Sequence, residues 1–248
     1  MSKAAELANL IGNINAGGGG VNRNVLINSA MNVAQRATSA TGKGDADGYF
    51  VCDRWNINVG ATSTGRFTLS QDSSAPSGFA NSLKFDCTTA DTSIAAGENM
   101  MLQQKIEGQN VQSFAKGTSD AKPFAVSFYV KGNASATYVA ALYDGDNSRV
   151  VASTFSVTTD WARVEITFPA DTTGALDDDN ASSLELWIVL HAGSNFTSGT
   201  LASTWASYDA TTVAAGGGSF FDSTDRTFFI TGVQSVSYTH LRAHETGR

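Results

Sequence analysis

Histidine, the usual general base and a common metal ligand, is scarce in this chain. Two of its three histidines, His240 and His244, lie in the last stretch, SVSYTHLRAHETGR (235–248). The third, His191, lies in a strand-like run among apolar neighbours, and no G-x-S-x-G elbow occurs anywhere. Because nucleophilic catalysis needs a base beside the nucleophile, we interpret His191 as a core or edge histidine and expect no catalytic residue.

Two clusters of acidic side chains could hold calcium, which prefers carboxylate and carbonyl oxygens. The turn YDGDN contributes Asp144 and Asp146, and LDDDNAS contributes Asp177 and Asp179. Neither cluster has the complete twelve-residue calcium loop, since Phe155 stands where the closing glutamate belongs. Calcium is therefore the one cofactor that we consider, and the alternative is that both clusters are solvated turns.

Aromatic side chains in turns and loops are candidates for sugar binding. A sugar ring is recognised by an aromatic face, with amide and carboxylate groups at its edge. Trp205 and Tyr208, in STWASYD, and Tyr143, beside the Asp-rich turn, are expected to be exposed and to bind carbohydrate. The alternative for Trp205 is that it closes one end of the fold. Trp187 lies in a strong strand pattern and is expected in the core.

Three glutamates on or near predicted strands, Glu107, Glu165 and Glu185, are candidates for glycoside hydrolysis. That reaction needs two carboxylates facing each other across a cleft at about 5–9.5 Å. The sequence brings no pair of them together, so a polysaccharide-degrading enzyme is our third hypothesis. Asp53, in the DRW stretch, is interpreted as a satisfied buried acid that ties a loop.

The elements that must position these residues are strands. Alternation with a period of two marks half-buried strands, and residues 184–193 are almost continuously apolar, as in a central strand covered on both sides. The turn YDGDNSR predicts a hairpin. The predicted strands lie at 48–59, 65–71, 82–88, 124–132, 137–142, 161–169, 184–193 and 227–234. Roughly ten strands without interleaved helices predict an all-β, two-sheet antiparallel sandwich of the jelly-roll type.

Composition limits the class of protein. A net charge of -7 with 16% charged residues argues against a nucleic-acid partner, because phosphate binding needs clustered Lys and Arg. No run of apolar residues reaches the length that spans a bilayer, and the N-terminus has no secretion signal. The cysteines, Cys52 and Cys87, are interpreted as reduced core thiols.

The chain divides into three parts. Residues 1–21 predict a short helical arm followed by a glycine-rich linker, NAGGGG, and 22–234 form the sandwich domain. The arm is either a disordered terminus or a docking segment. Residues 235–248 have neither strand nor helix period.

Six segments together resemble the sandwich domains of bacteriophage tail-fibre and related virion proteins, which look like carbohydrate-binding modules. They are NVLINSAMNVAQR, GYFVCDRWNI, MMLQQKIEGQNVQ, KPFAVSFYVKG, LHAGSNF and FFITGVQ. In this family the first segment is commonly a strand of the pattern NLLINGxMxVxQRGT, and ITGVQLEVG closes the fold. Ser29 and Ala30 replace the glycine turn of the first pattern.

The resemblance implies a non-enzymatic virion component, a tail-fibre or tail-tip subunit that binds host-surface glycans. Its other expected partners are virion tail proteins and two further copies in a homotrimer, with no nucleic acid and no membrane insertion. Its location would be the virion, assembled in the host bacterial cytoplasm. A ligand-free structural or capsid-decoration protein is the alternative.

The C-terminal stretch resembles something other than a protein. VSYTHLRAHET is what translation of a transposon adapter used in sequencing libraries produces, and it stands where the family has LEVG. We therefore expect residues 235–248 to be non-native and poorly packed, with the native chain running as far as Gln234.

Overall fold

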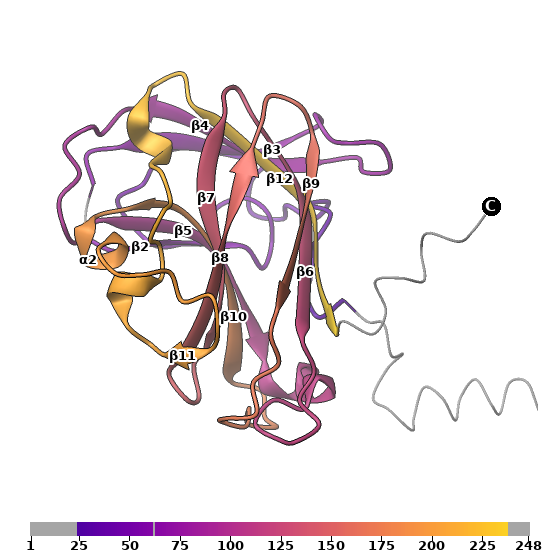
Figure 1. The fold of residues 1–248 in the computed structure, drawn as a ribbon. Helices are drawn as coiled ribbons and strands as arrows, with labels where there is room; N and C mark the ends of the chain where they lie inside the picture. Colours follow the sequence, from indigo (N-terminus) through magenta and orange to yellow (C-terminus); the bar gives the residue numbers. More distant parts are fainter. Residues whose placement is uncertain (1–23, 62, 238–248) are drawn as a thin grey trace, which may run out of the picture.

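Twelve strands form two antiparallel sheets that pack face to face (Figure 1). The structure is a computed structural model that describes residues 24–61 and 63–237. Sheet A has the order β1 (Ser39–Lys43), β3 (Arg66–Asp72), β4 (Ser82–Thr89), β12 (Thr227–Ser237), β6 (Phe124–Gly132) and β9 (Ala162–Phe168). Sheet B has the order β11 (Ala206–Ser207), β8 (Arg149–Val157), β7 (Ala136–Asp144), β10 (Ser182–Ala192), β5 (Asn99–Glu107) and β2 (Asn56–Val59). The predicted all-β sandwich is confirmed.

Within residues 24–61 and 63–237, helices are confined to short turns between strands. They are η1 (Gly108–Asn110), η2 (Gln112–Phe114), α2 (Ser194–Thr197), η3 (Ala210–Thr212) and η4 (Phe220–Asp222). In the described part of the chain no helix is long and apolar enough to cross a membrane. The predicted N-terminal helical arm lies outside the described residues.

The main core lies between the sheets and is rich in aromatic rings. Phe67, Phe85, Phe128 and Phe228 are fully buried and contact one another or neighbouring rings at centroid distances of 5.0–6.3 Å. Such pairs add to the stabilisation that burial of their area supplies. Cys52 and Cys87 are free and buried, as expected, and burial raises their pKa values to about 12 and about 11.

A second apolar layer covers part of the outer face of sheet B. Met101, Val139, Val150 and Val189 point away from the main core and pack against the segment that carries α2 and η3. This segment, in orange, runs outside the sheet in Figure 1. The layer explains why β10 is apolar on both faces, which confirms the prediction for residues 184–193.

The beginning of the sandwich differs from the expected strands. Residues 24–36 form no strand, because Asn28 and Met31 adopt left-handed φ values of 54° and 56°. The Asn28 side chain also bonds the backbone N–H and C=O of Val33 and so competes with a strand ladder. Likewise, residues 48–59 become a strand only from Asn56, although Val51, Trp55 and Ile57 of this run are buried.

The C-terminal end of β12 also differs from expectation. Ser235 and the next two residues pair with Val126, Ala125 and Phe124 of β6, and the buried Ser235 donates its N–H to the Asn24 side chain at 2.9 Å. The prediction of poor packing is therefore wrong for 235–237, because ladder hydrogen bonds use the backbone and do not require particular side chains. The rest of that stretch, 238–248, lies outside the described residues.

Candidate functional site

Three aromatic rings form a cluster on the outer face of sheet B, beside the covered part. The Tyr143 ring of β7 stacks on the Trp187 ring of β10, with centroids 4.7 Å apart and an interplanar angle of 19°. Tyr208 meets both rings edge-on at 5.4 and 6.3 Å. Trp187 is 7% exposed and forms the base, whereas Tyr208 is 38% exposed. We call Tyr143, Trp187 and Tyr208 the aromatic shelf.

Polar groups lie next to the shelf in the same strand register. Glu185 pairs with Tyr143 of β7 on one side and with Lys105 of β5 on the other. One Glu185 carboxylate oxygen, Oε2, accepts hydrogen bonds from Trp187 Nε1 at 2.8 Å and Gln103 Nε2 at 2.5 Å. This carboxylate therefore holds the Trp187 ring and the Gln103 amide in place.

Tyr208 remains a hydrogen-bond donor near neutral pH. Burial raises the pKa of its phenol above the ordinary value, and neighbouring Tyr143 and Asp209 raise it further. A shelf that combines ring faces with a protonated phenol can meet both the C–H surface and the hydroxyls of a polar ligand.

A small polar cavity adjoins the shelf through Lys105. We call it the polar pocket; it measures about 180 Å³ and is lined by Tyr49, Arg54, Lys105, Glu107, Asn180 and Ser182. Lys105 Nζ lies 3.7 Å from Glu185 Oε1, so the pocket and the shelf share this lysine–glutamate contact. The pocket is smaller than the ~300–1,000 Å³ typical of drug-sized ligands.

Tyr143 and Tyr208, two of the three predicted carbohydrate-binding residues, meet in this site. Trp187, which we expected in the core, is buried but belongs to the outer face. The alternation along β10 contained the signal, because Glu185 and Trp187 are two residues apart and must share a face.

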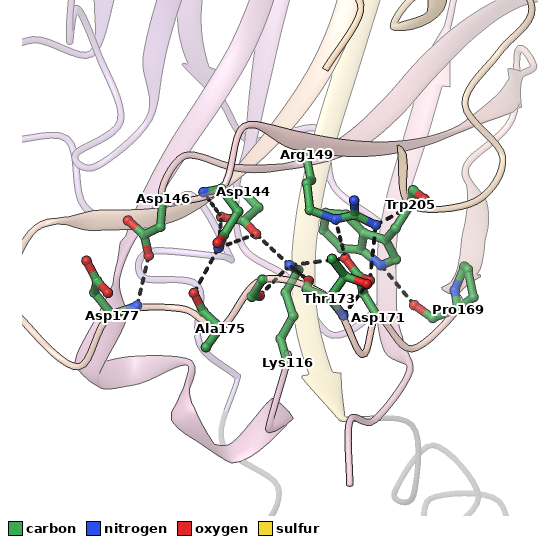
Figure 2. A network of polar contacts seen from close by, with 12 residues as sticks. Lys116, Asp144, Asp146, Arg149, Pro169, Asp171, Thr173, Ala175, Asp177 and Trp205 are labelled. Atoms are coloured by element: carbon green, nitrogen blue, oxygen red, sulfur yellow. Dashed lines mark hydrogen bonds and ion pairs between the residues drawn. The ribbon is translucent and has the colours of Figure 1, made fainter. Parts of the chain in front are cut away.

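Trp205 does not join the shelf, and the expectation that it is exposed is wrong. It is 9% exposed, belongs to the main core, and donates from Nε1 to the Pro169 carbonyl at 2.9 Å. Its ring packs near Phe124, at 5.7 Å, and lies 5.0 Å from Lys116 Nζ (Figure 2). Trp205 therefore closes one end of the sandwich, as its alternative interpretation held.

Asp144, the first expected calcium ligand, is bound to a lysine. Its side chain and that of Lys116 are fully buried, with Oδ2 and Nζ 2.5 Å apart. Lys116 Nζ also lies 3.1 Å from Asp171 and donates to the carbonyls of Thr173 and Gly174 (Figure 2). The calcium assignment is wrong for Asp144, because an ammonium already supplies the cation that its carboxylate needs.

Two of the remaining calcium candidates accept hydrogen bonds from the backbone of loops. Asp146 accepts from the Asp177 N–H at 2.9 Å, so the two clusters do come together (Figure 2). Asp179 accepts from the Ala181 N–H at 2.9 Å. Over 24–61 and 63–237, no group of three or more His, Cys, Asp or Glu side chains has a metal-binding arrangement.

Asp53, Glu165 and Glu185 lie in three different parts of the fold. Asp53 accepts from the Gln35 N–H at 3.3 Å and pairs with Arg36, so it ties a loop as expected, although its side chain is 19% exposed. Glu165 lies on the outer face of sheet A and Glu185 on that of sheet B. These two glutamates cannot face each other across one cleft, which removes that pair as a glycosidase centre.

His191 is a core histidine, as expected. It is completely buried, with Nδ1 2.8 Å from Ser219 Oγ and Nε2 3.2 Å from Glu98 Oε2. Burial lowers its pKa below the ordinary value, and the hydrogen bond and charge of Glu98, with the charge of Asp91, oppose this shift only in part. Its ring therefore favours the neutral form in the folded protein.

Lowering the pH from about 7 to about 5 is expected to destabilise the fold through His191, whose pKa in an unfolded chain is about 6.5. The pKa of His191 in the folded protein is lower, so the unfolded state binds a proton first as the pH falls. The stabilisation that is present above the unfolded pKa is therefore lost below it. Urea unfolding of the whole chain and of His191→Gln at both pH values measures the effect. The variant keeps His240 and His244, so equal pH dependence in the two proteins would contradict the assignment.

Comparisons with known proteins identify no family for this chain. No family model and no curated protein matches the chain. A crystal structure of the enzymatically active domain of bacteriophage CBA120 tailspike protein 4 matches 86% of the chain at 13% identity and a TM-score of 0.43, and the chain spans 21% of that structure.

Two solved carbohydrate-binding modules match nearly their whole length. TmCBM61, solved with β-1,4-galactotriose, matches 87% of this chain and 99% of its own at 10% identity and a TM-score of 0.42. A family 11 module from Clostridium thermocellum, solved with a mixed-linked tetrasaccharide, matches 81% and 97% at 12% identity and a TM-score of 0.39. At these values the likeness supports no conclusion about fold, ligand or role.

Proposed function

We propose that this protein is a non-enzymatic phage virion component, a tail-fibre or tail-tip subunit, that binds host-surface glycans through the outer face of sheet B. The observation that carries the binding role is the aromatic shelf beside the amide and carboxylate groups of Gln103 and Glu185. Aromatic faces with a few fixed polar groups are the chemistry that recognises sugars. The virion role is supported by the sequence segments that resemble tail-fibre domains.

A homotrimer that carries this face three times fits the proposal. One small, partly buried shelf offers weak affinity, and multivalent display raises avidity without any new contact. The other expected partners, virion tail proteins, would attach through parts of the chain other than the outer face of sheet B.

A glycan array probed with the whole chain tests the proposal. Binding to bacterial surface polysaccharides without their breakdown is the expected result. Absence of binding to every member, together with incorporation of the protein into phage particles, would favour the ligand-free structural or capsid-decoration role instead.

Release of reducing ends from a bound polysaccharide would favour the third hypothesis, an enzyme. Because Glu107 and Glu185 both belong to sheet B, loss of that turnover in Glu107→Gln and Glu185→Gln variants would locate its active site on this face. Turnover that persists in both variants would place it elsewhere.

The adapter interpretation of residues 235–248 also remains a proposal, supported by the run VSYTHLRAHET. Amplifying and reading the gene from its source DNA tests it. The expected result is a different sequence after Gln234, and an unchanged sequence would overturn it.

A further inference from the structure

Two cations converge on the polar pocket with most of their hydrogen-bonding capacity unused. Arg54 Nη2 lies 3.6 Å from Glu107 Oε1, and Lys105 Nζ lies 3.7 Å from Glu185 Oε1. Within the described residues, neither side chain makes a further hydrogen bond or ion pair, although a guanidinium has five N–H donors and an ammonium three. Both side chains are about half exposed, at 43% and 50%.

The two carboxylates beside these cations are engaged elsewhere. Glu107 Oε2 accepts from Asn110 Nδ2 at 3.0 Å, and Glu185 Oε2 accepts from Trp187 and Gln103. Each ion pair is therefore a single long contact to a carboxylate with other partners, which is a weak interaction in water. An anion that enters the pocket would find both cations available.

Two other cations of the fold are bound differently. Lys116 contacts two carboxylates and two carbonyls, and Arg149 donates to Asp171 through Nε and Nη2 at 2.8 and 3.2 Å. Lys116 and Arg149 therefore each have several short contacts. Arg54 and Lys105 do not follow this pattern, and both line the same cavity.

The backbone at Arg54 is strained. Its φ of 71° is left-handed, a conformation that is sterically unfavourable for a residue with a Cβ. Flanking bonds hold it there, from Asn28 Nδ2 to the Asp53 carbonyl at 2.9 Å and from the Trp55 N–H to the Cys52 carbonyl at 3.3 Å. Strain of this kind persists where the surroundings over-determine it, and it gathers at ligand sites.

We propose that the polar pocket binds the carboxylate of an acidic sugar residue, such as a uronic acid, within the glycan that lies on the aromatic shelf. This inference rests on the proposed function and names the class of its ligand. The planar fork of Arg54 matches a carboxylate in two-point geometry, and Lys105 adds a point charge. Asn180 and Ser182 supply an amide and a hydroxyl for the sugar's own hydroxyl groups.

The test compares acidic glycans with their carboxyl-reduced counterparts on one array, with the whole chain as the probe. The wild-type protein is expected to bind a uronate-containing polysaccharide at least about tenfold more tightly than the reduced form, because hydrogen bonds to charged groups carry about 1.5–3 kcal/mol. Arg54→Asn should remove this preference and leave affinity for the reduced form unchanged. Asn tolerates a left-handed φ, so the unfolding midpoint should not fall.

Two further variants sharpen the result. Arg54→Lys keeps the charge without the planar fork and should retain part of the preference. Arg163→Ala removes an arginine of similar exposure from the outer face of sheet A, and it should bind as the wild type does.

The contrary outcomes are distinct. Equal binding of acidic and reduced glycans, unaffected by Arg54→Asn, would overturn this inference and leave the proposed function intact. A preference for sulfated or phosphorylated members over uronates would overturn the carboxylate assignment. Binding to no member at all would overturn the inference and the proposed function together.

Discussion

Replacing Lys116 with alanine is expected to lower the free energy of unfolding by about 3–5 kcal/mol. The ammonium is fully buried and balances two carboxylates, those of Asp144 and Asp171, while Arg149 supplies the second positive charge of the network. Its removal leaves a buried negative charge without a partner, in a place that water does not reach. Arg149 and a backbone N–H hold the pKa of Asp171 below its usual range despite burial, so this carboxylate stays charged near neutral pH.

Urea unfolding at neutral pH measures the loss. The matched control is Lys84→Ala, which removes a lysine with one carboxylate partner on the outer face of sheet A, and its cost should not exceed about 1 kcal/mol. A Lys116→Ala protein as stable as this control would show that the network contributes no net stability. A double variant, Lys116→Met with Asp144→Asn, should recover part of the loss, because it removes one buried charge of each sign.

Replacing Tyr143 with alanine is expected to weaken glycan binding by roughly 30-fold, since truncating a central aromatic contact in an interface costs about 2 kcal/mol. The Tyr143 ring stacks on Trp187 and contacts Tyr208 edge-on, so it is the central ring of the aromatic shelf. The same change should alter stability less than Lys116→Ala does, because Tyr143 is only partly buried and lies outside the main core. Titration of the best-binding polysaccharide by isothermal calorimetry measures the loss.

Tyr129→Ala is the control for the shelf. Tyr129 is also a partly buried tyrosine on an outer sheet face, but it lies on sheet A, where it packs on Phe79 at 5.4 Å. Its removal should leave glycan affinity unchanged. If Tyr143→Ala and Tyr129→Ala bind alike, the ligand does not use the outer face of sheet B.

Much of the sandwich could be predicted from alternation, and much of its detail could not. The predicted strands at 65–71, 82–88, 124–132 and 161–169 match β3, β4, β6 and β9 closely. The strand that the resemblance implied for residues 24–36 is absent, because single left-handed residues and side-chain hydrogen bonds shape this segment. The short edge strands β1 and β11 are mostly exposed and have little apolar periodicity to detect.

The candidate site was predicted in part. Tyr143 and Tyr208 were identified by their polar surroundings in the sequence, and Trp205 was misplaced because its indole N–H finds a buried carbonyl partner. The sequence did not indicate that Arg54 and Lys105 line one pocket, because isolated surface cations are common and the two residues are far apart in the chain.

By itself the sequence determined the two-sheet fold, the central place of β10 and the reduced core thiols, and it left His191 as a core or edge residue. These follow from the period of side chains along one strand, which is a local property of the backbone. The tertiary structure alone decided which acids meet cations and which aromatic rings meet each other. Lys116 and Asp144 are 28 residues apart in the sequence. Tyr143 and Trp187 lie on β7 and β10, which are neighbours in sheet B although β8 and β9 separate them along the chain. Such partners depend on strand order and loop paths, which alternation leaves open.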